Sequence, residues 1–167
     1  MVILVDNQDN QIGLMEKLKA HEYGLLHRAF SVFILNSKGK MLLQKRAASK
    51  YHSPNLWTNA CCSHPQPNED LQDACKRRLK EEIGIHTTQD LEHIGHVLYK
   101  APFENGLTEH EYDHILVLRT EEQPILNPDE ASDFRYADIQ DIKKEIEQRP
   151  EEFTVWFKLI LEKGFFN

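Results

Sequence analysis

The sequence lacks any long apolar segment. No apolar run approaches the roughly 18 residues that a membrane-spanning helix needs, and the apolar opening from Met1 to Val5 reaches Asp6 too early for a signal peptide. We therefore expect a soluble, cytoplasmic protein that does not associate with membranes.

Cysteines are few, and basic residues are outnumbered. The cysteines are three, an odd number, and include no CxxC pair, which indicates free thiols in a reducing compartment and argues against a closed structural zinc site. Lys and Arg number 20 against 27 Asp and Glu, and the net charge of -7 disfavours a nucleic-acid-binding protein. A small anionic substrate remains compatible, because a few basic residues can converge locally.

What is present is typical of one compact domain. At 167 residues the chain is long enough to bury a core without disulfides. Its 40% hydrophobic and 28% charged residues argue against a disordered or fibrous chain. No internal repeat, low-complexity stretch or linker interrupts it, so residues 1–167 are predicted to form a single domain.

Alternating apolar residues, turn residues and capping residues predict the elements. The first elements are a hairpin of strands 30–35 and 41–45, a polar loop at about 49–68, and a helix from Asn68 or Glu69 to Gly84. A second hairpin follows, with strands 92–101 and 109–120 around Asn105-Gly106. The chain then forms a strand at 134–136, a helix at 138–148 that Asp138 could cap, and a last helix with Pro150 near its first turn. This order predicts an α/β layered domain built on a mixed sheet.

The helix ending at Gly84 and the loop before it carry a spaced set of charged and small residues. In chain order these are Ser63, Glu69, Arg77, Arg78, Leu79, Glu81, Glu82, Gly84 and Ile85. Alternating charge alone is more typical of a solvated amphipathic helix than of a metal site. The spacing, however, resembles the Nudix box: Gly, five residues, Glu, seven residues, then Arg-Glu-aliphatic-any-Glu-Glu-any-Gly-aliphatic. The resemblance implies a Nudix fold of the α/β (α+β) class, with a mixed β-sheet sandwiched between helices, whose box helix presents carboxylates to a divalent metal bound by a diphosphate.

Two positions depart from the box. Ser63 stands where the family has Gly, and Arg78 stands where it has the first Glu. Replacing a metal-ligand carboxylate by a cation would damage a pyrophosphohydrolase, because hydrolysis needs metals to generate and position hydroxide. It would help an enzyme that must hold a diphosphate without cutting it.

The loop before the helix narrows the resemblance. It reads Trp57-Thr58-Asn59-Ala60-Cys61-Cys62-Ser63-His64-Pro65 and resembles the catalytic loop of type I isopentenyl-diphosphate isomerases, which carries Thr-Asn, a Cys and a His-Pro. The family's catalytic Cys immediately precedes the first box position, which implies Cys62 and leaves Cys61 as a bystander. A lone Cys is more often an inert core residue, but a Cys close to a His in a polar loop is a better candidate for chemistry.

Histidines and glutamates match the family's metal site, which has three His and two Glu. The resemblance implies His21, His27, His64, Glu109 and Glu111 as the ligands. On a strand, Glu109 and Glu111 would point to one face and the residue between them to the other. A set that mixes imidazoles with carboxylates suits Mn²⁺, Mg²⁺ or Zn²⁺.

Four basic residues match the positions with which the family grips the substrate diphosphate. They are Lys17, Arg46, Lys50 and Arg78, each of which alone would pass as a surface charge. Arg offers a planar fork to phosphate oxygens, and Lys offers a point charge. Glu82, in the box, matches a ligand of a second ion, Mg²⁺, which binds together with the diphosphate.

The resemblance runs from about Lys17 to Trp156 and implies the reaction of an isopentenyl-diphosphate delta-isomerase. Isopentenyl diphosphate would become dimethylallyl diphosphate, in isoprenoid biosynthesis, through a tertiary carbocation at C3. Cys62 and Glu111 would face opposite sides of the isoprene unit, one giving a proton at C4 and the other taking one from C2; the order of roles stays open. Tyr99 would hydrogen-bond Glu111. Trp156, by default a core aromatic, would stabilise the cation with its indole.

Two rival classes stay open. A Nudix pyrophosphohydrolase of nucleoside diphosphate derivatives shares the fold and the box helix, and turnover of ADP-ribose or dinucleotides would favour it. A small zinc-stabilised binding module is compatible with the Cys and His content but lacks the CxxC pair. We expect small-molecule partners only, isopentenyl and dimethylallyl diphosphate, and a monomer or weak dimer.

Overall fold

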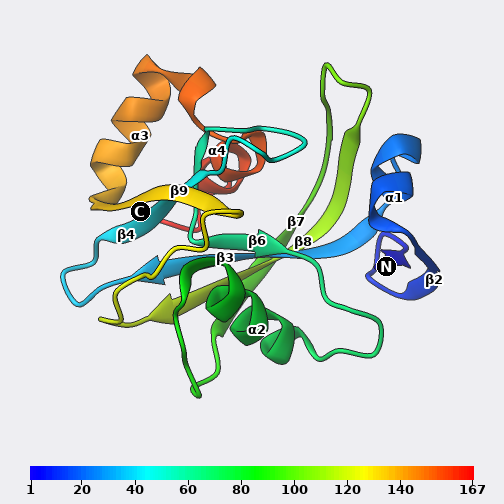
Figure 1. Cartoon of the computed structure of the whole chain (residues 1–167), viewed down its shortest axis with the longest axis horizontal. Coiled ribbons are helices and arrows are strands. Elements are labelled where there is room, and N and C mark those ends of the chain that lie inside the picture. Colours follow the sequence, from blue (N-terminus) through cyan, green and yellow to red (C-terminus); the bar gives the residue numbers. More distant parts are fainter.

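The computed structural model describes residues 1–167 and contains one mixed, nine-stranded sheet with helices on both faces (Figure 1). The strands are β1 (Val2–Val5), β2 (Gln11–Met15), β3 (His27–Leu35), β4 (Met41–Arg46), β5 (Trp57–Thr58), β6 (Cys61–Ser63), β7 (Glu92–Pro102), β8 (Thr108–Arg119) and β9 (Ala131–Ala137). The helices are α1 (Lys17–Tyr23), α2 (Leu71–Ile83), α3 (Ile139–Gln148) and α4 (Val155–Glu162), with a 3-10 turn η1 (Pro150–Glu152) before α4. None of the helices combines the length and the apolar content needed to cross a membrane.

Strand β3 is the centre of the sheet. It pairs in parallel with β8 along its whole length, from His27 opposite Glu111 to Leu35 opposite Arg119. It also pairs antiparallel with β1 and β6. Nearly all of its residues are buried, as expected for a strand covered on both faces. The predicted mixed sheet is therefore confirmed.

The first predicted hairpin forms only at its turn. Leu35 pairs with Met41, and the Asn36 N–H donates to the Lys40 carbonyl oxygen at 3.0 Å. Beyond that point β4 pairs with β9 and β5, while β6 pairs with β3. Local alternation does not reveal this divergence, because the competing strands come from distant segments. The second predicted hairpin, β7 with β8, forms along the full length of β7.

Two apolar cores flank the sheet, because the side chains of β3 alternate between its faces. Phe30 and Ile34 lie in the core beneath α2, together with Leu79 of that helix. Phe33 lies in the other core, where it packs with Phe157 of α4. Figure 1 shows α2 on one side of the sheet and α3 and α4 on the other. The predicted arrangement of a sheet between helices is confirmed.

Helix α2 begins and ends at its capping residues. The Asp70 side chain accepts a backbone N–H of the first turn at 2.8 Å, and Gly84 ends the helix in the left-handed conformation, with φ of 66°. The helix therefore spans Leu71–Ile83 and starts later than predicted. Asn68 has a φ of 64°, which is a turn conformation outside the helix.

The C-terminal and N-terminal parts differ from the prediction in several details. Strand β9 extends beyond residues 134–136, because it pairs with the whole of β4. Helix α3 lies where expected, but the Asp138 side chain makes no capping hydrogen bond. Pro150 opens η1, and α4 begins only at Val155, after Thr154 at its N-cap. The sequence pattern did not predict β1, β2 or α1, and it missed β5 and β6, which lie inside the predicted polar loop at 49–68.

Candidate active site

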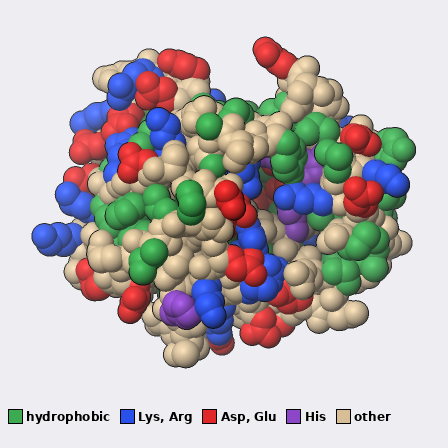
Figure 2. Space-filling view, in the orientation of Figure 1, with side chains coloured by type: hydrophobic (Ala, Val, Ile, Leu, Met, Phe, Trp, Pro, Cys, Tyr) green, Lys and Arg blue, Asp and Glu red, His purple; other side chains and the backbone are tan.

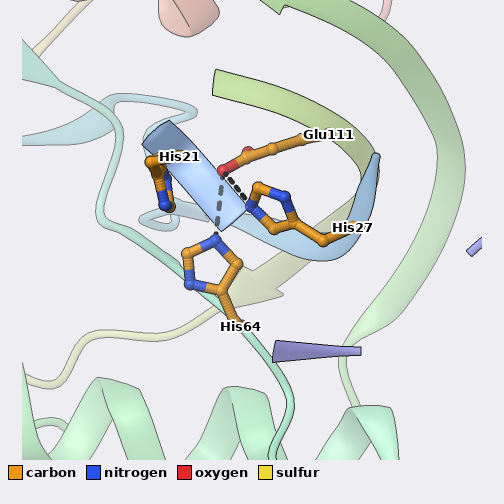
Figure 3. Close-up of side chains that lie close together, drawn as sticks. All are labelled: His21, His27, His64 and Glu111. Carbon is orange, nitrogen blue, oxygen red and sulfur yellow. Dashed lines mark hydrogen bonds and ion pairs between the residues drawn. The ribbon is translucent and has the colours of Figure 1, made fainter. Parts of the chain in front are cut away.

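Three histidines and a glutamate from four different segments meet on one side of the sheet (Figure 3). His21 lies on α1, His27 is the first residue of β3, His64 follows β6, and Glu111 lies on β8. One nitrogen or oxygen atom from each lies within 4.8 Å of the others. The parallel register of β3 and β8 sets His27 opposite Glu111, so the sheet itself brings two of the four together.

The protonation of these groups fits a divalent metal. His21 and His27 each place Nδ1 against a backbone carbonyl oxygen, at 2.7 and 2.8 Å, so Nδ1 carries a hydrogen and Nε2 points into the cluster. His21 Nε2 is buried and makes no hydrogen bond. His27 Nε2 lies 3.4 Å from Glu111 Oε1, and although burial lowers the pKa of His27, this carboxylate raises it overall. Burial lowers the pKa of His64 to about 3. Burial alone would raise the pKa of Glu111, but the imidazoles of His27 and His64 hold it well below its usual value. Neutral imidazoles and an ionised carboxylate are the ligand forms that metals require.

The second predicted glutamate ligand lies beside this cluster. Glu109 and Glu111 point to the same face of β8, and the Tyr99 hydroxyl donates to an oxygen of each at 2.8 Å. His110 points to the opposite face and contacts the Gly24 carbonyl oxygen through Nδ1 at 3.0 Å. Burial and the two carboxylates raise the pKa of Tyr99 far above its usual value, so its hydroxyl stays a donor.

The thiol of Cys62 is enclosed by hydrogen-bonding side chains. It donates to Asn59 Oδ1 at 3.1 Å, accepts from Trp156 Nε1–H at 3.0 Å and lies 3.4 Å from Ser31 Oγ. The Ser31 hydroxyl in turn donates to the buried Asp113 at 2.7 Å. Burial, and next the charge of Asp113, raise the pKa of Cys62. The thiol is therefore protonated at neutral pH.

Cys61 points away from this site. Successive residues of a strand face opposite sides of the sheet, and Cys61 is fully buried in the core beneath α2. Cys62 lies on the other face, packed against the core that contains Trp156. The short strand β6 thus separates the two adjacent thiols.

The predicted diphosphate-binding residues gather at one end of the site. Burial lowers the pKa of Lys17, and the positive charges of Lys50 and Arg78 lower it further. Lys50 and Arg78 both contact Glu130, at 2.7 and 3.1 Å. Arg46 and Arg78 each keep a buried Nε–H without a partner. The four cations therefore still have N–H donors and positive charge available for an anion.

Helix α2, which carries the box residues, places Glu82 at the same end of the site as these basic residues. Its carboxylate accepts from Arg78 at 2.7 Å and from Gln44 at 3.1 Å. Elsewhere in the box, Glu69 accepts two hydrogen bonds from Arg77, at 2.6 and 2.9 Å. Arg78, the departure from the box pattern, lies among three carboxylates instead of binding a metal.

One cavity joins all these groups. Its lining includes every predicted site residue except His21 and His27: Lys17, Arg46, Lys50, Cys62, His64, Arg78, Glu82, Tyr99, Glu109, Glu111 and Trp156. Figure 2 shows the hollow on this face, where basic and histidine side chains lie beside acidic ones. His21 and His27 lie against Glu111, behind the cavity wall.

Four residues of the site were missed from the sequence: His52, Ser31, Asp113 and Glu130. Asp113 continues the alternation of Glu109 and Glu111 on one face of β8, so the same spacing argument extends to it. His52 contacts Glu109 at 3.0 Å from the loop between β4 and β5. Nothing in its local sequence distinguishes it, because its partners come from other segments.

Comparison with known proteins gives a family and several relatives. A model described as the NUDIX domain matches residues 25–157. The isopentenyl-diphosphate Delta-isomerase of Aliivibrio fischeri (strain MJ11) is 49% identical and covers 97% of this chain and 93% of its own. The protein of that name from Serratia proteamaculans (strain 568) is 47% identical, over 97% and 89%. Isopentenyl-diphosphate Delta-isomerase 2 of Aromatoleum aromaticum is 44% identical, over 97% and 85%.

Solved structures share the fold. A Deinococcus radiodurans protein matches with a TM-score of 0.80 and 20% identity over 99% of both chains. The MutT protein of Methanosarcina mazei Go1 matches with a TM-score of 0.65 and 18% identity, over 83% of this chain and 91% of its own. Identities this low support a common architecture and no common activity.

Proposed function

Since the chain belongs to the NUDIX family and, within it, to the isopentenyl-diphosphate Delta-isomerases, we propose that Cys62 and Glu111 convert isopentenyl diphosphate into dimethylallyl diphosphate in the cavity described above. The observation that carries this assignment of residues is their meeting in one cavity with a cluster of basic side chains. A thiol and a carboxylate can donate and accept the protons, and the basic cluster can bind the diphosphate.

Lys17, Arg46, Lys50 and Arg78 are proposed to bind the diphosphate. Burial, and next the like charges of Lys50 and Arg78, lower the pKa of Lys17, so an anion among these cations would relieve their repulsion. The unpaired Nε–H groups of the two arginines are donors that phosphate oxygens would accept. Glu82 lies beside them and would bind a Mg²⁺ ion carried with the diphosphate.

His21, His27, His64, Glu109 and Glu111 are proposed to hold a divalent metal, Mn²⁺, Mg²⁺ or Zn²⁺. The Nε2 atoms of His21 and His27 support this assignment, because the backbone holds Nδ1 of each ring and leaves Nε2 directed into the cluster. When bound, such an ion supplies positive charge that orients Glu111 and lowers its proton affinity. The protein's own part is to fix both glutamates through the Tyr99 hydroxyl.

The reaction adds one proton to C4 and removes one from C2, so the site needs a donor and an acceptor at once. Cys62 and Glu111 fill these roles as a pair, one giving the proton and the other taking it, and the double bond moves by one position. The intermediate cation at C3 needs a partner that does not trap it. The indole of Trp156 provides an electron-rich face in the same cavity and already lies 5.2 Å from the Arg46 guanidinium.

The test is incubation with isopentenyl diphosphate and Mg²⁺ in deuterated water, followed by NMR at the methyl and C2 positions. We expect dimethylallyl diphosphate with deuterium in the methyl group formed from C4 and with one hydrogen lost from C2. Cys62→Ala protein serves as the matched control and should give neither product nor exchange. Folded, metal-loaded protein that releases phosphate or diphosphate without any isomer would contradict the proposal.

A further inference from the structure

His52 is a buried histidine that lies outside the Nudix box and the catalytic loop. It belongs to the loop of residues 47–56 that joins β4 to β5, and its side chain is only 5% exposed. Its Nε2 atom lies 3.0 Å from Glu109 Oε1. The ring therefore contacts one of the two glutamates proposed as metal ligands.

The His52 ring is held on several sides, which fixes the direction of Nε2. It stacks on Phe103 at 4.8 Å between centroids and 8° between planes. It meets the Trp156 ring edge-on at 5.7 Å, and Nδ1 lies 3.3 Å from Ser53 Oγ. A ring packed in this way has little rotamer freedom. Nε2 therefore points at the Glu109 carboxylate, where it can donate its hydrogen to Oε1.

Glu109 is thereby held at both oxygens. His52 contacts Oε1, and the Tyr99 hydroxyl donates to Oε2 at 2.8 Å. Groups that hydrogen-bond a metal-ligating carboxylate fix its orientation for the ion. The loop that carries His52 is itself held in place, since Asn105 in the β7–β8 turn donates to the Tyr51 carbonyl oxygen at 2.8 Å. Figure 1 shows this loop extending toward β7 and β8.

We propose that His52 is a positioning residue for Glu109, which it holds through Nε2–H in the orientation that the metal needs. The proposal rests on the metal-binding role given to Glu109 above. Lys50 belongs to the same loop and lines the cavity, so His52 also fixes the loop that presents a diphosphate-binding cation. A direct ligand role is the alternative, because His21, His52 and Glu109 offer three ligand atoms within 4.8 Å of one another.

The experiment measures Mn²⁺ affinity by calorimetry on metal-stripped full-length protein. His52→Phe keeps the stacking but removes the donor, and we expect a loss of about 10- to 100-fold in affinity. His52→Gln supplies an amide N–H at a similar reach, so it should restore most of the affinity. His96→Phe replaces an exposed histidine that stacks on Tyr112 and serves as the matched control, with wild-type affinity expected.

The outcomes separate the proposals. Equal Mn²⁺ affinity in wild-type and His52→Phe proteins would overturn the positioning role and leave the metal site intact. Equal losses in His52→Phe and His52→Gln would overturn it in favour of a ring nitrogen that binds the metal itself. Wild-type protein that binds no divalent metal would overturn both the metal site and the positioning role. Thermal unfolding of the metal-stripped variants checks that each one folds.

Discussion

The Cys62 thiol contacts Asn59, Trp156 and Ser31, whereas Cys61 is buried on the opposite face of β6. We therefore predict that Cys62→Ala abolishes isomer formation. Cys61→Ala should keep most of the activity and lose only some stability, because it removes a small group from a packed core. Turnover by NMR and unfolding by circular dichroism measure the two effects. An inactive Cys61→Ala protein beside an active Cys62→Ala protein would reverse the assignment.

Trp156 combines a hydrogen bond with an aromatic face. Its Nε1–H donates to Cys62 at 3.0 Å, and a guanidinium lies 5.2 Å from its ring. Trp156→Leu removes both functions, and we expect kcat to fall by about 30-fold or more, since a desolvated cation over an indole is stabilised by about 2 kcal/mol. Trp156→Phe keeps a weaker face and should lose less.

The two variants should be compared by kcat, with substrate affinity measured separately, because the cations proposed to bind the diphosphate are other residues of the cavity. Equal kcat values for the Phe and Leu variants would mean that the ring electrons do not matter. If both values also equalled that of the wild type, the N–H would not matter either, and Trp156 would serve packing alone.

At the scale of elements, the end of α2 shows how one residue sets a boundary. Gly84 has a φ of 66°, and an added Cβ would lie 2.7 Å from the Ile125 carbonyl oxygen. Gly39 also has a positive φ, of 74°, but nothing lies near its added Cβ. Gly39→Ala should cost about 1–2 kcal/mol of unfolding free energy for the left-handed backbone. Gly84→Ala should cost a further 1–3 kcal/mol or so for the clash.

Urea unfolding of both variants provides the measurement. The clash is hard to relieve, because the Ile125 N–H donates to the Ile83 carbonyl oxygen at 2.8 Å and holds the backbone in place. Equal destabilisation of the two variants would show that the backbone near Ile125 moves easily enough to relieve the clash.

Elements with local signals were predictable from the sequence. Asp70 and Gly84 mark the ends of α2, and Asn105-Gly106 marks the turn between β7 and β8. Elements whose partners are distant in sequence were not. Strand β3 pairs with β6 and β8 rather than along β4, and no local pattern encodes that choice. No residue of strand β2 is fully buried, and its alternating apolar residues Ile12 and Leu14 are exposed, so the core does not mark this strand.

The site residues divide in the same way, into those with a local signal in the sequence and those that depend on distant partners. The i, i+2 spacing of Glu109 and Glu111 predicted a shared face, and Tyr99 bridges both. The register that sets His27 opposite Glu111 depends on a parallel pairing of distant strands. The sequence grouped these two residues only through the family resemblance. His52 was missed because its contact with Glu109 joins a loop to a strand more than fifty positions later.

At the scale of the whole molecule, an acidic chain gathers several of its cations around one cavity. The net charge is -7, yet Lys17, Arg46, Lys50 and Arg78 line one cavity. Glu130 contacts two of them and keeps their charge partly balanced. A diphosphate carries more negative charge than one carboxylate, so it competes with Glu130 for Lys50 and Arg78. The local field, rather than the net charge, decides which anions enter.

The proposed metal ligands lie on α1, on the paired strands β3 and β8, and on the loop after β6, so a bound ion would tie α1 and this loop to the sheet. Mn²⁺ at about 100 times its Kd should stabilise the folded state by about 2.7 kcal/mol. For a domain of this size that corresponds to an increase of roughly 5–10 °C in Tm, which scanning calorimetry detects, and a chelator should reverse it. His64→Ala removes one ligand and should lose most of the increase, whereas His96→Ala should keep it. If His64→Ala retained the full increase, the ion would bind elsewhere. Because the effect is on the folded state alone, it tests the metal site without any reference to turnover.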